Sequence, residues 1–340
     1  DTVITTFDEK IILDGLSTSN FTITTSTGET IIPTALIIDP NNAFIVGLKM
    51  PTTLLFGIIY TVSATGISDC SGNEINLFNQ VIFGLPEPAI ANDVVINEVL
   101  FNPISEGVDF VEIYNRSAKI IDLSTLIIAE MDLFDTTEVN EYDNISLSGR
   151  LLLPGQYLCL SSDPDLIAAQ YFSIDTGNFL TVNELPNYAD NEGIVAILDN
   201  TLNEIDRLHF FDDWHYALLS NQDGVSLERI NYDYTTQDNN NWFSAASDVH
   251  FATPGYQNSN FGAYTSSGTV AVSSPVFSPD GDGFNDLMVI TYNTETEGFT
   301  GRFQIFSAQG KLVKDLTGNI TLSREGFITW DGLNNDDQKA

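Results

Sequence analysis

The stretch VVINEVLFNPISEGVDFVEIYNRSAKIIDLS, which runs from Val94 to Ser124, decides the fold of this chain. Its Val, Ile, Phe and Tyr residues fall in short runs that are interrupted at Asn102-Pro103 and again at Ser105 to Gly107. Runs of this kind, rich in β-branched and aromatic residues and bounded by turn formers, are typical of β-strands. The centre of the chain is therefore predicted to be built from sheets.

The overall composition extends this prediction to the whole chain. Of the 340 residues 43% are hydrophobic, and they include 22 Phe and 12 Tyr. A chain of this length holds about two or three domains, each with its own core. One short helix is expected, over Pro164 to Gln170. No apolar stretch reaches the roughly 18 residues that a membrane-spanning helix needs, so we expect a protein that does not itself span a membrane.

The charge is strongly unbalanced. Twelve Lys and Arg stand against 47 Asp and Glu, which gives a formal net charge of −35. Nucleic-acid binding depends on Lys and Arg that neutralise phosphates, so we expect no nucleic-acid partner. Two explanations of the acidity stay open and are compatible: a well-solvated surface, and binding of Ca²⁺ outside the cell by oxygen ligands.

The two cysteines, Cys70 and Cys159, fall in different predicted domains. A disulfide between them would need both residues at one interface within bonding reach, and we do not expect it. The sequence contains no CxxC pair, which excludes a thiolate metal site of that kind.

Several short sequences in the middle of the chain occur in a fixed order. They are INEV at Ile96 to Val99, DFVEIYN at Asp109 to Asn115, IDLS at Ile121 to Ser124, SLER at Ser226 to Arg229, and TPG at Thr253 to Gly255. In this order they resemble the lamin tail domain, an immunoglobulin-like sandwich that bacteria also carry on secreted proteins. The resemblance implies such a domain over residues 91–260.

The first 88 residues alternate short apolar runs with turns, which favours a sandwich. LSTSNFTI at Leu16 to Ile23 and GIIYTVSATGISDCSGNEI at Gly57 to Ile75 resemble the bacterial immunoglobulin-like domain first described in surface-layer proteins. A connector with two prolines, Gly84 to Pro88, follows this domain. Its composition predicts an extended, semi-rigid spacer.

The last part of the chain follows a Ser/Gly/Thr linker at Tyr264 to Gly268. VFSPDGDGFNDLMVITY at Val276 to Tyr292 and EGFITWDG at Glu325 to Gly332 resemble the C-terminal sorting domain of proteins exported by the type IX secretion system of Bacteroidetes, of the gliding-motility-associated type. That domain is also immunoglobulin-like, and in the family one more strand follows the last of these motifs. We therefore expect a third domain over residues 269–340 that lacks its last strand, in a natural chain that continues past Ala340. The expected fold is all-β, with three consecutive immunoglobulin-like β-sandwich domains at 1–88, 91–260 and 269–340.

The loop from Asp280 to Asp286 is the best candidate for a metal site. Oxygen ligands at alternate positions, with glycine permitting a sharp turn, are what a Ca²⁺ loop needs. Aligned on a helix-loop-helix calcium loop, the ligand positions are occupied by the side chains of Asp280, Asp282 and Asp286 and by the carbonyl of Phe284.

This loop also departs from a calcium loop at two ligand positions. Ser278 is a poor first ligand and Val289 is no ligand at the twelfth place. A complete site therefore needs further oxygens, for which we consider Asp331. The alternative is a rigid Asx-type turn that leads into a strand without any ion.

A second polar group lies in the central stretch, and it comprises Asn97, Glu98, Asp109 and Glu112. Two neighbouring carboxylates could act as acid and base. Such residues more often hold loop backbone, and no histidine, serine elbow or basic oxyanion group accompanies them. We expect a structural role and name no catalytic residue.

The densest polar and aromatic patch is Asp206 to Tyr216. His209 and His215 are spaced in a way that matches no helical zinc motif. The patch is expected to pack in the core, with an exposed surface for a sugar or a protein partner as the alternative.

The first hypothesis is a non-enzymatic, secreted or cell-surface protein that acts through its sandwich loops, as an adhesion module or as a subunit of an outer-membrane complex. The resemblance of residues 269–340 implies type IX secretion machinery or outer-membrane proteins as partners, with an unidentified protein or glycan as the ligand. The alternative is a set of accessory modules of a larger secreted hydrolase whose catalytic domain precedes Asp1.

Overall fold

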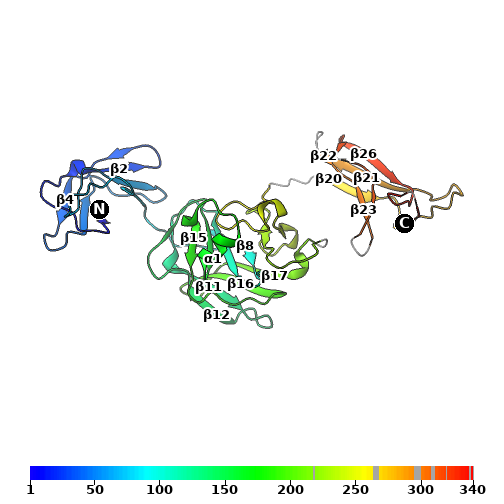
Figure 1. Ribbon diagram of the computed structural model, residues 1–340, viewed down its shortest axis with the longest axis horizontal. Helices are drawn as coiled ribbons and strands as arrows, with labels where there is room; N and C mark the ends of the chain where they lie inside the picture. Colours follow the sequence, from blue (N-terminus) through cyan, green and yellow to red (C-terminus); the bar gives the residue numbers. More distant parts are fainter. Residues whose placement is uncertain are drawn as a thin grey trace. The chain divides into compact units, whose positions relative to one another are not determined.

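The structure is a computed structural model that describes residues 1–216, 219–262, 268–294, 300–307, 311–318, 320–336 and 338–339. Most of the expected linker, residues 264–267, lies outside the described residues. The chain divides into two compact units, Asp1–His215 with Asn221–Phe261, and Gly262–Ala340 with Tyr216–Ser220. The prediction of an all-β fold is confirmed, because sheets dominate both units (Figure 1).

Residues 2–83 form two antiparallel sheets around one core. The first sheet has the order β1 (Thr2–Thr6), β5 (Ile45–Lys49), β4 (Ala35–Ile38). The second has the order β3 (Thr30–Ile31), β2 (Phe21–Thr25), β6 (Tyr60–Ala64), β7 (Gln80–Phe83). Alternate residues of β2 and β6 are buried, as expected for strands with one face on a core, and Phe21, Ile23, Val46 and Leu48 are fully buried there.

Residues 94–244 form two larger sheets with a core between them. One sheet has the order β12 (Val139–Asn144), β11 (Leu126–Met131), β16 (Glu192–Asp199), β17 (Glu204–Phe211). The other, six-stranded sheet has the order β15 (Phe179–Thr181), β14 (Tyr157–Ser161), β9 (Phe110–Asn115), β8 (Val94–Leu100), β18 (Leu227–Arg229), β19 (Trp242–Ser244). A small pair, β10 (Ile121–Asp122) and β13 (Leu151–Leu152), accompanies them. All pairs in these sheets are antiparallel except β14 with β15.

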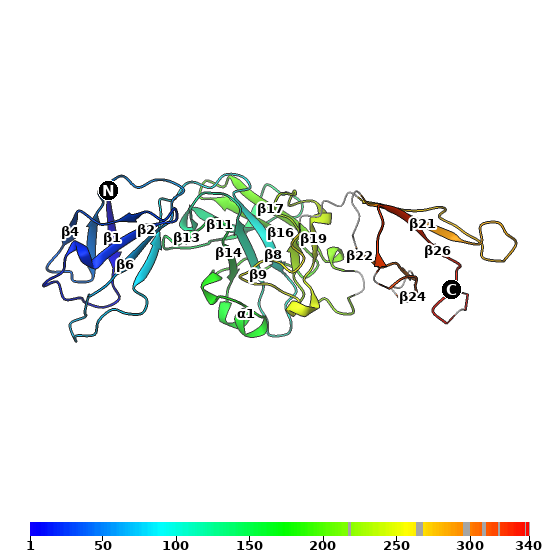
Figure 2. The same cartoon turned by 90° about the horizontal axis from the view of Figure 1, so that it is seen from above.

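The six-stranded sheet is buried on both faces, since every residue of β8 is buried. One face contributes to the main core together with the four-stranded sheet. The other face is covered by α1 (Pro164–Gln170), which contacts β14 and β15 (Figure 2), and by residues 251–261, which we call the closing segment. The predicted short helix is confirmed residue for residue: Asp163 caps it, with its Oδ1 accepting from the Leu166 N–H at 3.0 Å, and Pro164 occupies the first turn.

The second unit has three small sheets. The first has the order β20 (Gly268–Val272), β21 (Met288–Thr294), β26 (Glu325–Trp330). The second pairs β22 (Thr300–Gly301) with β25 (Ile320–Thr321), and the third pairs β23 (Gln304–Phe306) with β24 (Leu312–Asp315). Among its described apolar side chains only Ile290 is buried, at 7% exposure, whereas Val270 and Phe327 are 69% and 66% exposed. Both β20 and β26 pair on one side alone within the described part of this sheet.

Short 3₁₀ turns connect the strands, at η1 (Thr18–Asn20), η2 (Leu123–Thr125), η3 (Thr176–Asn178), η4 (Asp212–Trp214), η5 (Asn239–Asn241) and η6 (Ser247–Val249). Both cysteines are free, Cys159 buried in β14 and Cys70 exposed, as expected. No helix in the described ranges is long and apolar enough to cross a membrane. Residues 2–83, 94–244 and 268–330 share no sheet, while the division into three domains stays a prediction.

Candidate functional site

Strand register places three glutamates side by side on the second face of the six-stranded sheet. Glu98 in β8 lies opposite Glu112 in β9 and opposite Glu228 in β18. We call Glu98, Glu112 and Glu228 the glutamate row, and each of them is 0% exposed. A β-bulge between Ile96 and Glu98 directs the neighbouring Asn97 to the same face, where its Nδ2 donates to Glu112 Oε1 at 2.7 Å.

The closing segment supplies the hydrogen-bond donors that the row needs. Glu98 Oε1 accepts from Ser226 Oγ at 2.5 Å and from the Thr253 N–H at 2.8 Å, and Glu112 Oε2 accepts from the Gly255 N–H at 2.5 Å. Glu228 accepts from Thr253 Oγ1 at 2.8 Å, the Ser259 N–H at 3.0 Å, Ser259 Oγ at 2.7 Å, the Asn260 N–H at 3.0 Å and Asn260 Nδ2 at 3.0 Å. The row therefore anchors the segment that covers it.

Burial disfavours the charged form of these carboxyls. It raises the pKa of Glu98 to about 8, and the charge of Glu228 adds to the shift. Burial, followed by the charge of Glu98, also raises the pKa of Glu112 well above its ordinary value. An acid–base pair must reach its substrate, whereas this row is sealed beneath the closing segment. The structure thus shows Asn97, Glu98 and Glu112 in the structural role that the sequence favours.

Asp109 does not join the glutamate row. It lines a separate cavity of about 290 Å³ together with Ser162, Tyr188 and Asp190. Burial raises the pKa of Asp109 to about 7, the charge of Asp190 adds to the shift, and a hydrogen bond from the Tyr188 backbone opposes it. Its carboxyl is therefore partly protonated near neutral pH, and the sequence alone carried no signal for this.

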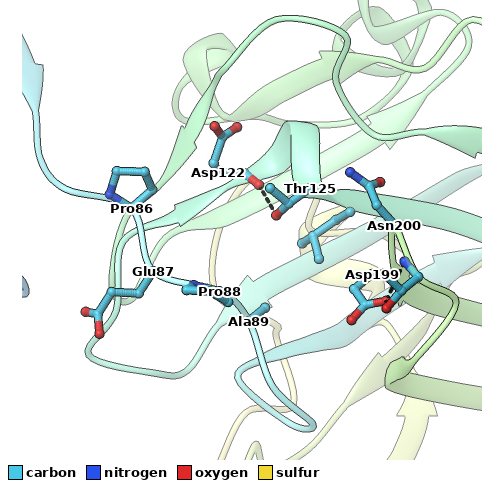
Figure 3. Close-up of a pocket in the computed structure, with 10 residues that line it drawn as sticks. Pro86, Glu87, Pro88, Ala89, Asp122, Thr125, Asp199 and Asn200 are labelled. Carbon is cyan, nitrogen blue, oxygen red and sulfur yellow. Dashed lines mark hydrogen bonds between the residues drawn. The ribbon is translucent and has the colours of Figure 1, made fainter.

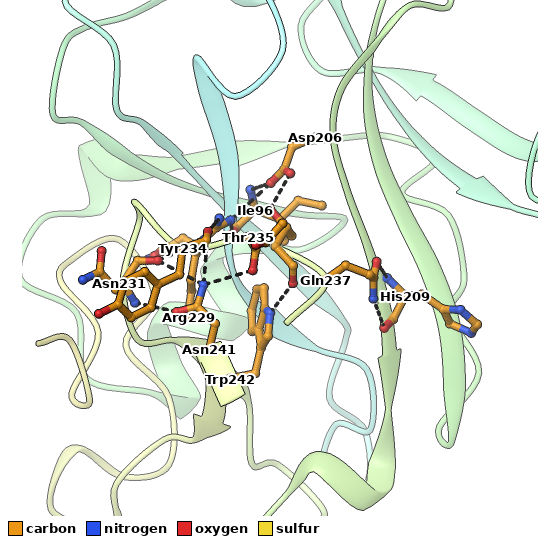
Figure 4. Close-up of polar contacts among 12 residues, drawn as sticks. Ile96, Asp206, His209, Arg229, Asn231, Tyr234, Thr235, Gln237, Asn241 and Trp242 are labelled. Carbon is orange, nitrogen blue, oxygen red and sulfur yellow. Dashed lines mark hydrogen bonds and ion pairs between the residues drawn. The ribbon is translucent and has the colours of Figure 1, made fainter. Parts of the chain in front are cut away.

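A buried ion pair joins the two large sheets on the opposite side of β18. Arg229 is 0% exposed, and its Nη1 lies 3.3 Å from Asp206 Oδ2 of β17 (Figure 4). The guanidinium also donates to the carbonyls of Ile96, Asn231 and Tyr234 at 3.1, 3.2 and 2.7 Å. Burial raises the pKa of Asp206 and lowers that of Arg229, so desolvation outweighs their attraction in both cases.

The aromatic patch of β17 and η4 is divided between core and surface. Phe210 is fully buried and stacks on Phe101 at a centroid distance of 4.2 Å. His215 is 4% exposed, its Nδ1 lies 2.8 Å from Ser244 Oγ, and burial lowers its pKa to about 4. His209 is partly exposed and pairs with Glu192 at 2.9 Å. The two histidines thus have different partners, and the core interpretation holds for Phe210 and His215.

The proline-containing connector is held along the middle sheets. The Glu87 N–H donates to the Ile120 carbonyl at 2.8 Å. The connector lines a cavity of about 350 Å³ with Asp122, Thr125 and Asp199 (Figure 3). Asp199 accepts four hydrogen bonds from its own turn, led by those from Asn203, which lower its pKa to about 2. The cavity therefore presents a carboxylate that its own loop already satisfies.

The loop Asp280–Asp286 brings the three predicted carboxylates together. Asp280, Asp282 and Asp286 each offer an oxygen within 4.8 Å of the others, and Asp331 is not part of this group. Asp286 Oδ1 accepts from the Gly281 N–H at 2.7 Å and its Oδ2 from the Gly283 N–H at 2.8 Å, which lowers its pKa.

The same loop also has the backbone geometry and the internal hydrogen bonds of an Asx-type turn. Gly281 and Gly283 have φ of 82° and 89°, a region that favours glycine. The side chain of Phe284 is 73% exposed, and its backbone carbonyl stays the predicted ligand atom. These hydrogen bonds support the Asx-turn interpretation, and calcium binding by Asp280, Asp282, Phe284 and Asp286 stays a prediction.

Comparisons with known proteins leave the family open. No protein-family model matches the chain, and no curated protein matches it. Among solved structures it is similar to a DUF4876 family protein from Bacteroides thetaiotaomicron, with 14% identity, 76% of this chain and 92% of that chain covered, and a TM-score of 0.29. It is also similar to the surface-layer protein SbsC, with 10% identity, 97% of this chain and 61% of that chain covered, and a TM-score of 0.23.

Calcium binding at the loop can be measured directly. We expect isothermal titration of the chelator-treated full chain with CaCl₂ to give a binding isotherm that Asp280→Ala abolishes. Calcium at 100 times its dissociation constant should stabilise the second unit by about 2.7 kcal/mol. Asp69→Ala, which removes an exposed turn carboxylate outside the three-carboxylate group, is the matched control. An isotherm that Asp280→Ala leaves unchanged would remove calcium from this loop.

The buried ion pair gives a second prediction. Asp206→Ala leaves the Arg229 charge buried without its carboxylate, so we expect unfolding free energy to fall by about 3–5 kcal/mol in urea denaturation. The control is Asp233→Ala, which breaks the pair Arg116–Asp233, whose aspartate side chain is 81% exposed. That change should cost only about 0–1 kcal/mol. Equal losses in the two variants would contradict the assigned role.

Proposed function

We propose that this chain is a non-enzymatic, secreted or cell-surface protein that serves as an adhesion module or as a subunit of an outer-membrane complex. The observation that carries the proposal is the use of the carboxylates. Glu98, Glu112 and Glu228 are sealed inside the fold, where they hold the closing segment and not a substrate. These buried polar groups fix the closing segment in place, as a scaffold for recognition requires.

The turns support a role in binding because they are made rigid by their own side chains. Asp69 accepts from the Ser71 and Asn73 N–H groups, both at 2.8 Å, and Asp132 accepts from the Phe134 and Asp135 N–H groups, both at 2.8 Å. A preorganised loop loses less conformational entropy when a partner binds. With a net charge of −35, such loops favour a partner surface with basic or neutral groups.

We further propose that the second unit directs export by a type IX secretion system, with its machinery or outer-membrane proteins as partners. The support is the resemblance of Val276–Tyr292 and Glu325–Gly332 to the sorting domain of that system. In the structure these two segments are adjacent, since β21 pairs with β26 and Phe277 packs on Trp330 at 5.3 Å.

Export can be tested in a bacterium that has this system. We expect a membrane-impermeant reagent to label the full chain on intact cells, and a chain without residues 268–340 to stay unlabelled and inside the outer membrane. A chain without residues 1–83 is the control, since it keeps the proposed sorting unit and should still be labelled. Surface labelling of the chain without residues 268–340 would contradict the sorting role.

A further inference from the structure

One hydroxyl of the closing segment lies between two buried carboxyls. Thr253 Oγ1 is 2.9 Å from Glu98 Oε2 and 2.8 Å from Glu228 Oε1. A threonine hydroxyl carries one proton and can donate only once. If both carboxyls were ionised, one of these short contacts would join two oxygens with no proton between them. The geometry therefore requires a proton on one of the two carboxyls.

The neighbouring donors identify which carboxyl keeps this proton. Glu228 accepts four further hydrogen bonds, from the N–H groups and side chains of Ser259 and Asn260, and these use both of its oxygens as acceptors. Glu98 Oε2 has Thr253 Oγ1 as its partner in the described part of the chain. Protonated Glu98 can thus donate to Thr253 Oγ1, which in turn donates to ionised Glu228.

We propose that Glu98, Thr253 and Glu228 form a proton-retaining latch that holds the closing segment on the six-stranded sheet. Loss of the Glu98 proton leaves two anions on either side of one hydroxyl, and the closing segment then opens. The latch is a conformational device within the middle sheets, and it does not depend on how the protein is exported or what it binds.

None of the described titratable groups near Glu98 can compensate the negative charge that remains when Glu98 loses its proton. The titratable groups that face Glu98 are Glu112 from β9, Glu228 from β18, Cys159 from β14, Tyr171 after α1 and Tyr256 from the closing segment. None of these described groups becomes positive. Arg229 follows Glu228 on β18 but points to the opposite face, toward Asp206.

The direction of the pH dependence follows because Glu98 is protonated when the closing segment lies on the sheet. The pKa of Glu98 is raised from 4.5 to about 8, so the latch contributes its full stability below the lower value and loses it as pH rises through the upper one. Between these two values, protection of the closing segment against exchange should fall by about tenfold per pH unit, and above the upper value it should level off.

The experiment is amide hydrogen exchange of the full chain between about pH 6 and 10, corrected for the intrinsic rate. We expect the Thr253 and Gly255 amides, which donate to Glu98 and Glu112, to lose protection as pH rises to about 8 and to show no further loss above it, while amides of β16 keep theirs. E98Q places a permanent N–H donor beside Thr253 Oγ1, so its protection should be constant over this pH range and at least equal to that of the wild type at the lowest pH. E228Q is the matched control, because its amide N–H groups would face the donors of Ser259 and Asn260 and should expose the segment at every pH.

A second measurement tests the proton without any pH change. The infrared spectrum of the wild-type chain at neutral pH should contain a carbonyl band of a protonated, buried carboxylic acid that weakens in E98Q. The latch is overturned by the absence of this band, by wild-type protection that stays constant between about pH 6 and 8, or by an E98Q chain that keeps the wild-type loss. Failure of E98Q to fold at neutral pH would also overturn it, because the neutral amide supplies the same donor.

Discussion

The burial of three carboxyls on one face of the six-stranded sheet is the main constraint on this structure. A buried carboxyl without donors is strongly unfavourable, and the register of β9, β8 and β18 puts Glu112, Glu98 and Glu228 in one row. Apart from the side chain of Asn97, which donates to Glu112, the strands supply few of those donors, because their own N–H groups are committed to the ladder. Segment 251–261 must therefore cross this face, and its path is fixed by Thr253, Gly255, Ser259 and Asn260.

Strand β18 links this face to the rest of the sandwich. Successive residues of a strand point to opposite faces, so Glu228 holds the closing segment while Arg229 reaches Asp206 across the main core. One three-residue strand thus fixes both the cover of the sheet and the partner sheet. Both contacts are buried and polar, so removing one partner of either contact would leave an uncompensated polar group in the interior.

The sequence predicted those features that depend on local pattern. β-branched runs located the strands, and the stretch from Pro164 to Gln170 located the single described α-helix. The structural role of Glu98 and Glu112 followed from the lack of catalytic partners, but their link to Glu228 did not, because pairing across more than a hundred residues leaves no local signal. The bulge at Asn97 could not be predicted from the sequence either, since both residues of a bulge have the residue types of an ordinary strand. The carboxylates of the Asp280 loop were brought together as predicted, whereas Asp331 was not among them.

The two thiols of the chain differ in their exposure and in their reactivity toward labelling reagents. Cys159 is 0% exposed, and burial, with the charges of Glu112 and Glu98, raises its pKa well above the ordinary value, so it is present as an unreactive thiol. Cys70 lies exposed in a turn near Asp69 and Asn73. Cys70 is therefore a labelling site that the unaltered chain already contains. A maleimide dye or spin probe attached there would report on the first seventy-odd residues, while the folded middle sheets shield the sulfur of Cys159 from the reagent.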